Sequence, residues 1–320
     1  MKKFIKVSLI IASALLFLGL CLCALGYALG GADAFFVNNE DYKSVTATFD
    51  EVYSVEVDSV SADVRLISAT SDEVKVTYPD TKMFGYRAES DNGKLEIRYE
   101  EKRHWYEYIG ISFSDEDVVI VIELPQEVYE AININTTSGD ISVSEGLVAK
   151  TCAFNTTSGE LRAELNADEL VVNTTSGDVV LSADVKHFAT VNTTSGDVTA
   201  GGTFSDIKLS STSGDTHLSN ISAKNVTVSS TSGEVEFSDM VVSGDVSVNT
   251  LSGDVSFAHV NAENYSVETT SGDVRGTITE PKIFDVNTTS GEFVTPHVDN
   301  AKGFFRADTT SGDVIIEIKK

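Results

Sequence analysis

The stretch Asn-Thr-Thr-Ser-Gly-Asp at residues 173–178 decides the fold of this chain, because close copies of it return at a nearly constant interval. Successive copies of its glycine, called the marker glycine below, are 18 to 21 residues apart. A sequence that repeats at such a period is built from one structural unit stacked on itself. The marker glycines are Gly139, Gly159, Gly177, Gly196, Gly214, Gly233, Gly253, Gly272, Gly291 and Gly312.

Apolar residues flank each marker glycine at fixed distances. Around Gly177 they are Leu170 and Val172 before the glycine and Val179 after it. Apolar and polar residues alternate within each arm, which is typical of a half-buried β-strand. The alternation changes parity at the Gly-Asp pair, so the chain must bend there. Glycine suits a bend because it tolerates positive φ and lets another backbone approach closely.

The segments that connect the arms are short and show no helical period. They leave no room for a packed crossover helix, so equivalent strands of successive units must lie side by side and parallel. The sequence therefore predicts an all-β fold, a right-handed parallel β-solenoid of about ten coils of about 19 residues each, over residues 131–320.

Residues 44–130 alternate as strands do but without the regular period, and we predict that they form a β-rich N-terminal cap module. The segment 60–64 resembles a degenerate corner with Ala62 in the place of the marker glycine, which indicates a distorted first coil that carries an insertion. The aromatic residues Trp105, Tyr106 and Tyr108 of this insertion either contact a ligand or plug the open end of the hydrophobic column.

Residues 7–31 contain no charged side chain. As a helix they would extend about 37 Å, enough to span a bilayer. Three lysines precede them and acidic residues follow, which predicts a single-pass transmembrane anchor, a cytoplasmic stub at 1–6, a linker at 32–43 and an extracytoplasmic C-terminal part. A cleaved signal sequence is the alternative, although the apolar core of such signals usually has about 7–15 residues.

The formal net charge of the chain is −26. So acidic a protein is not expected to bind nucleic acid, whose phosphates would repel it. Cys152 is the only cysteine outside the predicted anchor, so no disulfide within the solenoid is possible. It occupies an inward column, which predicts a buried small hydrophobic residue rather than a reactive thiol.

The outward positions of the repeat are polar. Rows of Asn and Thr, such as Asn155 and Thr157, either hydrogen-bond up the stack or present a regular face to an ordered ligand. An acidic residue follows every marker glycine, and this acid column either caps the corners by accepting hydrogen bonds or holds Ca²⁺. The sequence favours capping, since the glycine-rich motif of calcium-binding solenoids is absent. The calcium candidates are Asp178, Asp197, Asp215, Asp254 and Asp273.

No residue pattern indicates catalysis or a cofactor. A serine precedes every marker glycine, and ten repeated serines indicate a structural role, whereas a nucleophile is singular and has a base beside it. The five histidines fall at unrelated places in the repeat. We therefore expect no catalytic residue and no bound cofactor.

The recurrent Thr-Thr-Ser-Gly-Asp-Val corner, behind a β-rich head that ends near residues 124–125 and an N-terminal anchor, resembles the bacterial putative-adhesin family of β-strand-repeat proteins of unknown function. The resemblance covers residues 44–320. It implies a surface β-solenoid of the cell envelope with a non-enzymatic role in adhesion or in the envelope-stress response, bound to an envelope component or envelope protein. Two alternatives remain: a structural spacer, or a glycan-active β-helix enzyme.

The chain stops at Lys320, directly after the predicted strand at residues 314–318. The sequence therefore predicts an uncapped C-terminal coil, which either ends in charged residues that protect the strand edge or makes an end-to-end or partner contact.

Overall fold

The structure is a computed structural model that describes residues 12–21, 43–81, 83–102 and 118–319. These residues belong to two units, one of 1–43, 80–85 and 101–117, and one of 44–79, 86–100 and 118–320. The first unit contains a helix at residues 12–21. Among the described residues no helix has the length and apolarity needed to cross a bilayer. The other residues of the predicted anchor lie outside the described residues.

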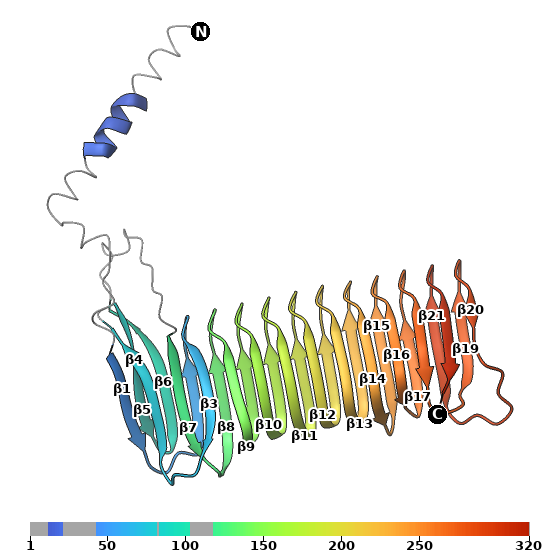
Figure 1. Ribbon diagram of the computed structural model, residues 1–320, viewed down its shortest axis with the longest axis horizontal. Coiled ribbons are helices and arrows are strands. Elements are labelled where there is room, and N and C mark those ends of the chain that lie inside the picture. The colour runs from blue at the N-terminus through green and yellow to red at the C-terminus, as the bar shows by residue number, and fades with distance from the viewer. Residues whose placement is uncertain (1–11, 22–42, 82, 103–117, 320) are drawn as a thin grey trace, which may run out of the picture. The chain divides into compact units, whose positions relative to one another are not determined.

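The second unit is a right-handed parallel β-solenoid of about ten turns, as the repeat predicts (Figure 1). Strands of successive coils pair in parallel, and the apolar columns stay in register, with Leu170 opposite Ala189 and Val172 opposite Val191. In chain order the strands are β1 (Lys43–Phe49), β2 (Ser54–Asp58), β3 (Asp63–Ala69), β4 (Val74–Asp80), β5 (Phe84–Asp91), β6 (Lys94–Glu101), β7 (Val119–Pro125), β8 (Val128–Asn135), β9 (Ile141–Asn155), β10 (Leu161–Asn173), β11 (Val179–Asn192), β12 (Val198–Ser210), β13 (Thr216–Ser230), β14 (Val235–Val242), β15 (Asp245–Thr250), β16 (Val255–Asn261), β17 (Asn264–Glu268), β18 (Val274–Ile278), β19 (Ile283–Thr288), β20 (Phe293–Val294), β21 (Phe304–Thr309) and β22 (Val314–Ile318).

Each coil has a second bend that the repeat pattern does not reveal. From β9 to β13 the segments expected to be short connections are strand: β10, for example, runs without interruption from one marker corner to the next. The chain turns six or seven residues after the marker glycine. Positive φ angles mark this bend in several coils, at Gly146 (94°), Gly202 (121°), Asn220 (55°) and His259 (56°).

The hydrophobic core is a continuous column between the walls of the coils. Phe237 stacks on Phe257 with ring centroids 5.2 Å apart, and Tyr265 lies 5.1 Å from Phe305. Cys152 is also in this column, and burial raises the pKa of its thiol to about 12. The prediction that Cys152 is buried is thereby confirmed.

At every marker corner a hydroxyl that is buried or, at Ser230 and Thr288, half-buried holds the turn. The side-chain oxygen three residues before each marker glycine accepts a hydrogen bond from the glycine N–H, at 2.9 to 3.1 Å. The marker glycines themselves are needed for close approach: a Cβ on Gly214 would lie 2.0 Å from the carbonyl oxygen of Gly196. The hydroxyl residues are Thr136, Thr156, Thr174, Thr193, Ser211, Ser230, Thr250, Thr269, Thr288 and Thr309.

At the N-terminal end of the solenoid the coils do not follow chain order. Strands β2 and β3 form a coil in which Ala62 occupies the marker position, directly below Gly139. This coil lies between β8–β9 on one side and β6–β7 on the other. Strand β7 then pairs antiparallel with β4, and β4 pairs with β1. The apolar side chains of the outermost coil are therefore fully buried, as at Leu95 and Ile120.

The C-terminal end shows the same exchange, and this corrects the prediction that the last coil in the sequence is the uncapped one. Strand β21 pairs with both β17 and β19, and β22 pairs with both β18 and β20. The last coil in the sequence is thus enclosed, and the coil formed by β19 and β20 is outermost. Strand β20 has only two residues, so this arrangement leaves the shorter arm at the exposed end.

Candidate functional site

The Asn rows are used for hydrogen bonds within the solenoid. The side-chain amide of Asn155 donates to Asn135, Asn173 donates to Asn155, and Asn192 donates to Asn173, each at 2.8 Å. The first amide of the ladder, that of Asn135, donates to Asp58, also at 2.8 Å. These side chains stabilise the stack, and their mutual bonds leave fewer donors for an ordered ligand.

The acid column caps the corners. The carboxylate of Asp178 accepts a hydrogen bond from the backbone N–H of Asp197 at 2.9 Å, and Asp197 accepts one from Asp215 at 2.8 Å. Among the described residues no equivalent bond follows Glu160 or Glu234, where the side chain is one methylene longer. The carboxylate of each Asp therefore binds a backbone N–H of the next coil.

Cations neutralise part of the acid column. Arg162 pairs with Glu160 at 2.5 Å, and Arg275 pairs with Asp273 at 2.6 Å and with Asp313 at 3.4 Å. Within the part of the chain that the structure describes, no group of three or more acidic, histidine or cysteine side chains is arranged to hold a metal ion. Calcium binding by Asp178, Asp197, Asp215, Asp254 and Asp273 stays the less favoured of the two interpretations of the sequence.

The residue types used in catalysis are spread along the solenoid. The hydroxyl of Ser232 donates to the carbonyl oxygen of Thr212 at 3.1 Å. His217 pairs with Glu236 at 3.0 Å. This pair lies after the marker glycine, whereas the repeated serines lie before it. The predicted aromatic cluster, Trp105, Tyr106 and Tyr108, lies outside the described residues.

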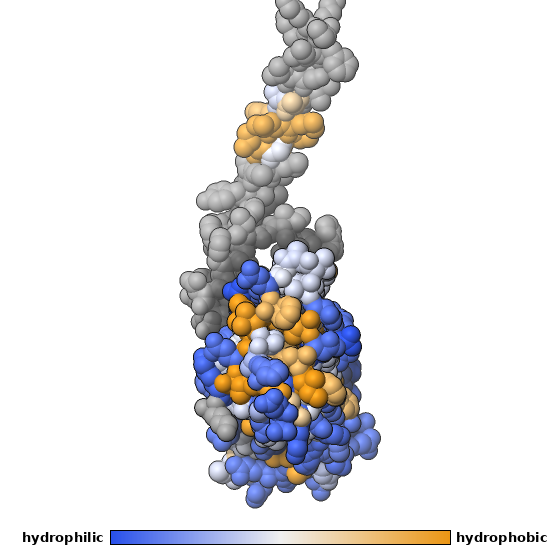
Figure 2. All heavy atoms as spheres, turned by 90° about the vertical axis from the view of Figure 1, so that its right-hand side faces the viewer, coloured by the Kyte–Doolittle hydropathy of each residue, from blue (hydrophilic) through white to orange (hydrophobic). Residues whose placement is uncertain are grey.

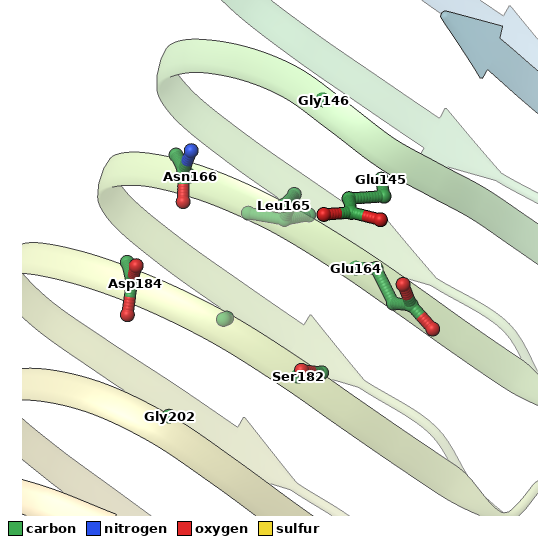
Figure 3. A pocket seen from close by; sticks show the side chains of 9 residues that line it. Glu145, Gly146, Glu164, Leu165, Asn166, Ser182, Asp184 and Gly202 are labelled. Carbon is green, nitrogen blue, oxygen red and sulfur yellow. The ribbon is translucent and has the colours of Figure 1, made fainter.

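A groove of about 300 Å³ crosses four successive coils at their second bend (Figure 3). Leu165 and Ala183, exposed by only 5% and 4%, line it from the core side. Two side chains, Glu145 and Glu164, lie on one side of Leu165 (Figure 3). Asn166 and Asp184 lie on the other side.

Two glycines lie in the outer two of the four coils that form the groove. Gly146 and Gly202 line it, both have positive φ, and neither has a side chain to fill the bend. In the next coils the equivalent bend is occupied by larger residues, Asn220 and Asp239. The sequence contained one signal for the groove, namely glycines that stand outside the marker column.

The groove can bind hydrogen-bond donors. Carboxylate oxygens of Glu145, Glu164 and Asp184 and the amide of Asn166 surround the apolar surface of Leu165. Asp184 also accepts a hydrogen bond from the backbone N–H of Thr203 at 3.1 Å, which fixes its carboxylate. Such a surface suits hydroxyl or ammonium groups attached to an apolar frame.

Comparison with known proteins identifies one family. The model of the Toastrack DUF4097 family matches residues 52–202 and 183–320. No curated protein matches the chain. A solved structure of a putative lipid binding protein from Parabacteroides distasonis has 14% identity and a TM-score of 0.49, covering 88% of this chain and 99% of that chain. A putative adhesin from Bacteroides fragilis has 11% identity and a TM-score of 0.42, with the same coverage of both chains.

Proposed function

This chain belongs to the Toastrack DUF4097 family, and on that basis we propose that it is a non-enzymatic, adhesin-like interaction protein of the bacterial envelope. The observation that carries the proposal is the groove at the second bend. It is a concave surface with an apolar floor and polar walls, formed by side chains of four successive coils.

The groove is built on paired strands rather than on loops. Its residues come from β9, β10, β11 and β12, which are in register with one another along most of their length. A ligand therefore meets a backbone that is already in place, which lowers the entropic cost of binding. We propose as ligand an envelope component rich in hydroxyl or ammonium groups.

The sequence supports a position at the cell membrane. Residues 7–31 are uncharged, lysines precede them and acidic residues follow. We propose that they anchor the chain with its N-terminus in the cytoplasm and its solenoid outside. Alkaline extraction of membranes tests the anchor: the chain is expected to stay in the membrane pellet, and its release into the supernatant would contradict this.

Calorimetry with the purified full chain tests the groove. Soluble cell-wall glycans and amine-bearing polymers are titrated against the wild type, with and without Ca²⁺. We expect saturable binding to one of them that falls at least tenfold, by about 1.4 kcal/mol or more, in the variant Glu145→Gln, Glu164→Gln, Asp184→Asn.

The control variant has the same change of charge outside the groove: Glu236→Gln, Glu263→Gln, Asp206→Asn. An equal loss of affinity in both variants would show a general effect of charge and would contradict the groove as the binding site. Absence of saturable binding would favour the structural spacer. Dependence on Ca²⁺ would support the acid column as a metal site.

The glycan-active enzyme remains a second candidate, because Glu145 and Glu164 are two carboxylates in one groove (Figure 3). Hydrolysis of glycans needs such a pair. We expect no release of reducing ends from bound glycans. Turnover that disappears in Glu164→Gln alone would replace the binding proposal with the enzyme.

A further inference from the structure

The outermost C-terminal coil exposes residues that are buried in the coil beneath it. Phe305, Ala307 and Val314 of the enclosed coil are 0% exposed. Their equivalents in the outermost coil are Phe284 and Val286, which are half-buried, and Phe293, which is 58% exposed. The hydrophobic column therefore ends at an open face.

Further apolar side chains enlarge this end face. Val294 is 58% exposed, and Ile283 and Phe304, which are register partners on β19 and β21, are 49% and 55% exposed. Figure 2, which views the C-terminal end, shows hydrophobic residues gathered near the centre of the face with hydrophilic residues around them.

The backbone of β19 also has one unpaired edge among the described residues. The N–H of Ile283 donates to the carbonyl oxygen of Gly303, towards β21. Because successive residues of a strand point their N–H and C=O groups to opposite sides, those of Phe284, Val286 and Thr288 point to the open edge. An edge of this kind is a template for another strand.

We propose that two copies of this chain associate end to end through this face, about a two-fold axis. Each coil within the solenoid is covered by another coil with the same apolar columns, and a second copy of the outermost coil supplies such a surface. Two-fold pairing of β19 with itself is antiparallel. With Val286 at the axis, Asp285 of one copy lies opposite Asn287 of the other, so no carboxylates face each other.

The opposite end of the solenoid explains why the association stops at two copies. There β4 and β1 continue the sheet beyond β7, and the apolar columns are covered. Within the described part of each chain only this end face is open. An interface that each copy forms with the same face of the other gives a closed dimer rather than a filament. The dimer does not depend on the groove or on its ligand.

Sedimentation equilibrium of the full chain in a mild non-ionic detergent tests the proposal. We expect a monomer–dimer equilibrium that shifts towards dimer as NaCl rises from 0.05 to about 0.5 M, because salt screens the repulsion between two chains that each have a charge of −26.

The variant Phe293→Lys, Val294→Lys is expected to weaken the dimer at least a hundredfold. The matched control Phe188→Lys, Val241→Lys places the same changes at exposed positions elsewhere on the solenoid, 41% and 59% exposed in the wild type, and is expected to dimerise normally. A second variant, Val286→Pro, removes an N–H of the open edge without adding charge, and edge strands tolerate proline.

Circular dichroism checks that the variants keep the fold. A wild type that stays monomeric at about 100 µM overturns the proposal. Equal loss of dimer in the control, or a dimer that survives both end-face variants, also overturns it. Larger, open-ended assemblies would overturn the two-fold closure.

Discussion

At the scale of single residues, two buried threonines of the same solenoid have opposite effects on its stability. Thr250 is 3% exposed, and its hydroxyl accepts the N–H of Gly253 at 3.0 Å. Thr216 is 2% exposed, and its hydroxyl has no hydrogen-bond partner. Leaving a hydroxyl buried without a partner costs free energy, whereas a bonded one offsets the burial of the backbone N–H.

We expect Thr216→Val to raise the free energy of unfolding by about 1 kcal/mol, because it removes an unpaired polar atom without changing the shape of the side chain. The neighbouring coils already have valine there, at Val198 and Val235. Urea unfolding followed by circular dichroism measures the change. Lower stability of the variant would mean that the hydroxyl has a partner.

The reverse is expected for Thr250→Val, which leaves the N–H of Gly253 buried and unbonded. A loss of about 1–3 kcal/mol in the same urea experiment would agree with this. If both substitutions change stability in the same direction, the distinction between the bonded hydroxyl of Thr250 and the unbonded hydroxyl of Thr216 is wrong.

The sequence predicted inward and outward positions well at this scale, because a period of two is a strong signal. It did not reveal the buried hydroxyls of Thr174 and its equivalents. By alternation with Leu170 and Val172 the position of Thr174 points inward, but its polar side chain breaks the apolar pattern that marks the core. Only the structure shows that the residue is buried and that its hydroxyl accepts the N–H of Gly177.

At the scale of the repeated element, the corner depends on backbone contact between coils. The carbonyl oxygen of each marker glycine lies where a Cβ on the next one would be, as for Gly196 beneath Gly214. This repeated contact, rather than an unusual φ, explains why glycine recurs in the column.

We expect Gly214→Ala to destabilise the solenoid by about 3 kcal/mol, because the coils must separate to admit a methyl group. Ser213→Ala, one residue earlier at the same corner but exposed, is expected to change stability by less than about 0.5 kcal/mol. Thermal unfolding of both variants decides. An unchanged melting temperature for Gly214→Ala would refute the corner geometry.

The Asn ladder gives a second test of the element. Asn173→Ala removes one bond to each neighbouring coil and is expected to lower the free energy of unfolding by about 1–2 kcal/mol. Asn249→Ala removes only a 3.5 Å contact to Glu268, and a much smaller loss is expected. If the two variants lowered the midpoint of urea unfolding equally, the Asn–Asn hydrogen bonds would not be what stabilises the stack.

The marker column determined where the first bend lies, whereas the second bend and the groove were not predicted. Their residues differ from coil to coil: Gly146, Gly202, Asn220 and His259 share a positive φ but no side-chain type. A property of the backbone that different residues satisfy leaves no column in the sequence. The groove depends on that property, and the sequence signals it only through glycines that stand outside the marker column, such as Gly146 and Gly202.

At the scale of the whole molecule, charge opposes compaction. Acidic residues outnumber basic ones 49 to 23, and ten of the acidic residues form one column. Adjacent carboxylates about 5 Å apart repel by about 0.8 kcal/mol in water, and salt reduces this repulsion. Hydrogen bonds from the next coil offset part of it.

We expect the melting temperature to rise with NaCl up to about 0.5 M, as screening weakens this repulsion. CaCl₂ and MgCl₂ at equal ionic strength are expected to act alike, since the Asp carboxylates cap corners. Stabilisation by Ca²⁺ well above that by Mg²⁺ would instead support the calcium candidates, and Asp197→Asn should then reduce it.

The repeat also did not predict the order of coils at the two ends. Coils of similar sequence stack on one another almost equally well. The period and the apolar pattern therefore do not determine which coil lies next to which other coil. Pairing of β21 with both β17 and β19 is a property of the completed stack.

The enclosed last coil has a consequence for biosynthesis. During translation β19 and β20 leave the ribosome before β21 and β22, yet they belong outside them. If they docked on β17 and β18 first, they would have to detach again to admit the last segment. The coil of β19 and β20 can therefore take its final place only after β21 and β22 have been synthesised, and a ribosome stalled before β21 has emerged would hold a chain whose outer two coils are unassembled.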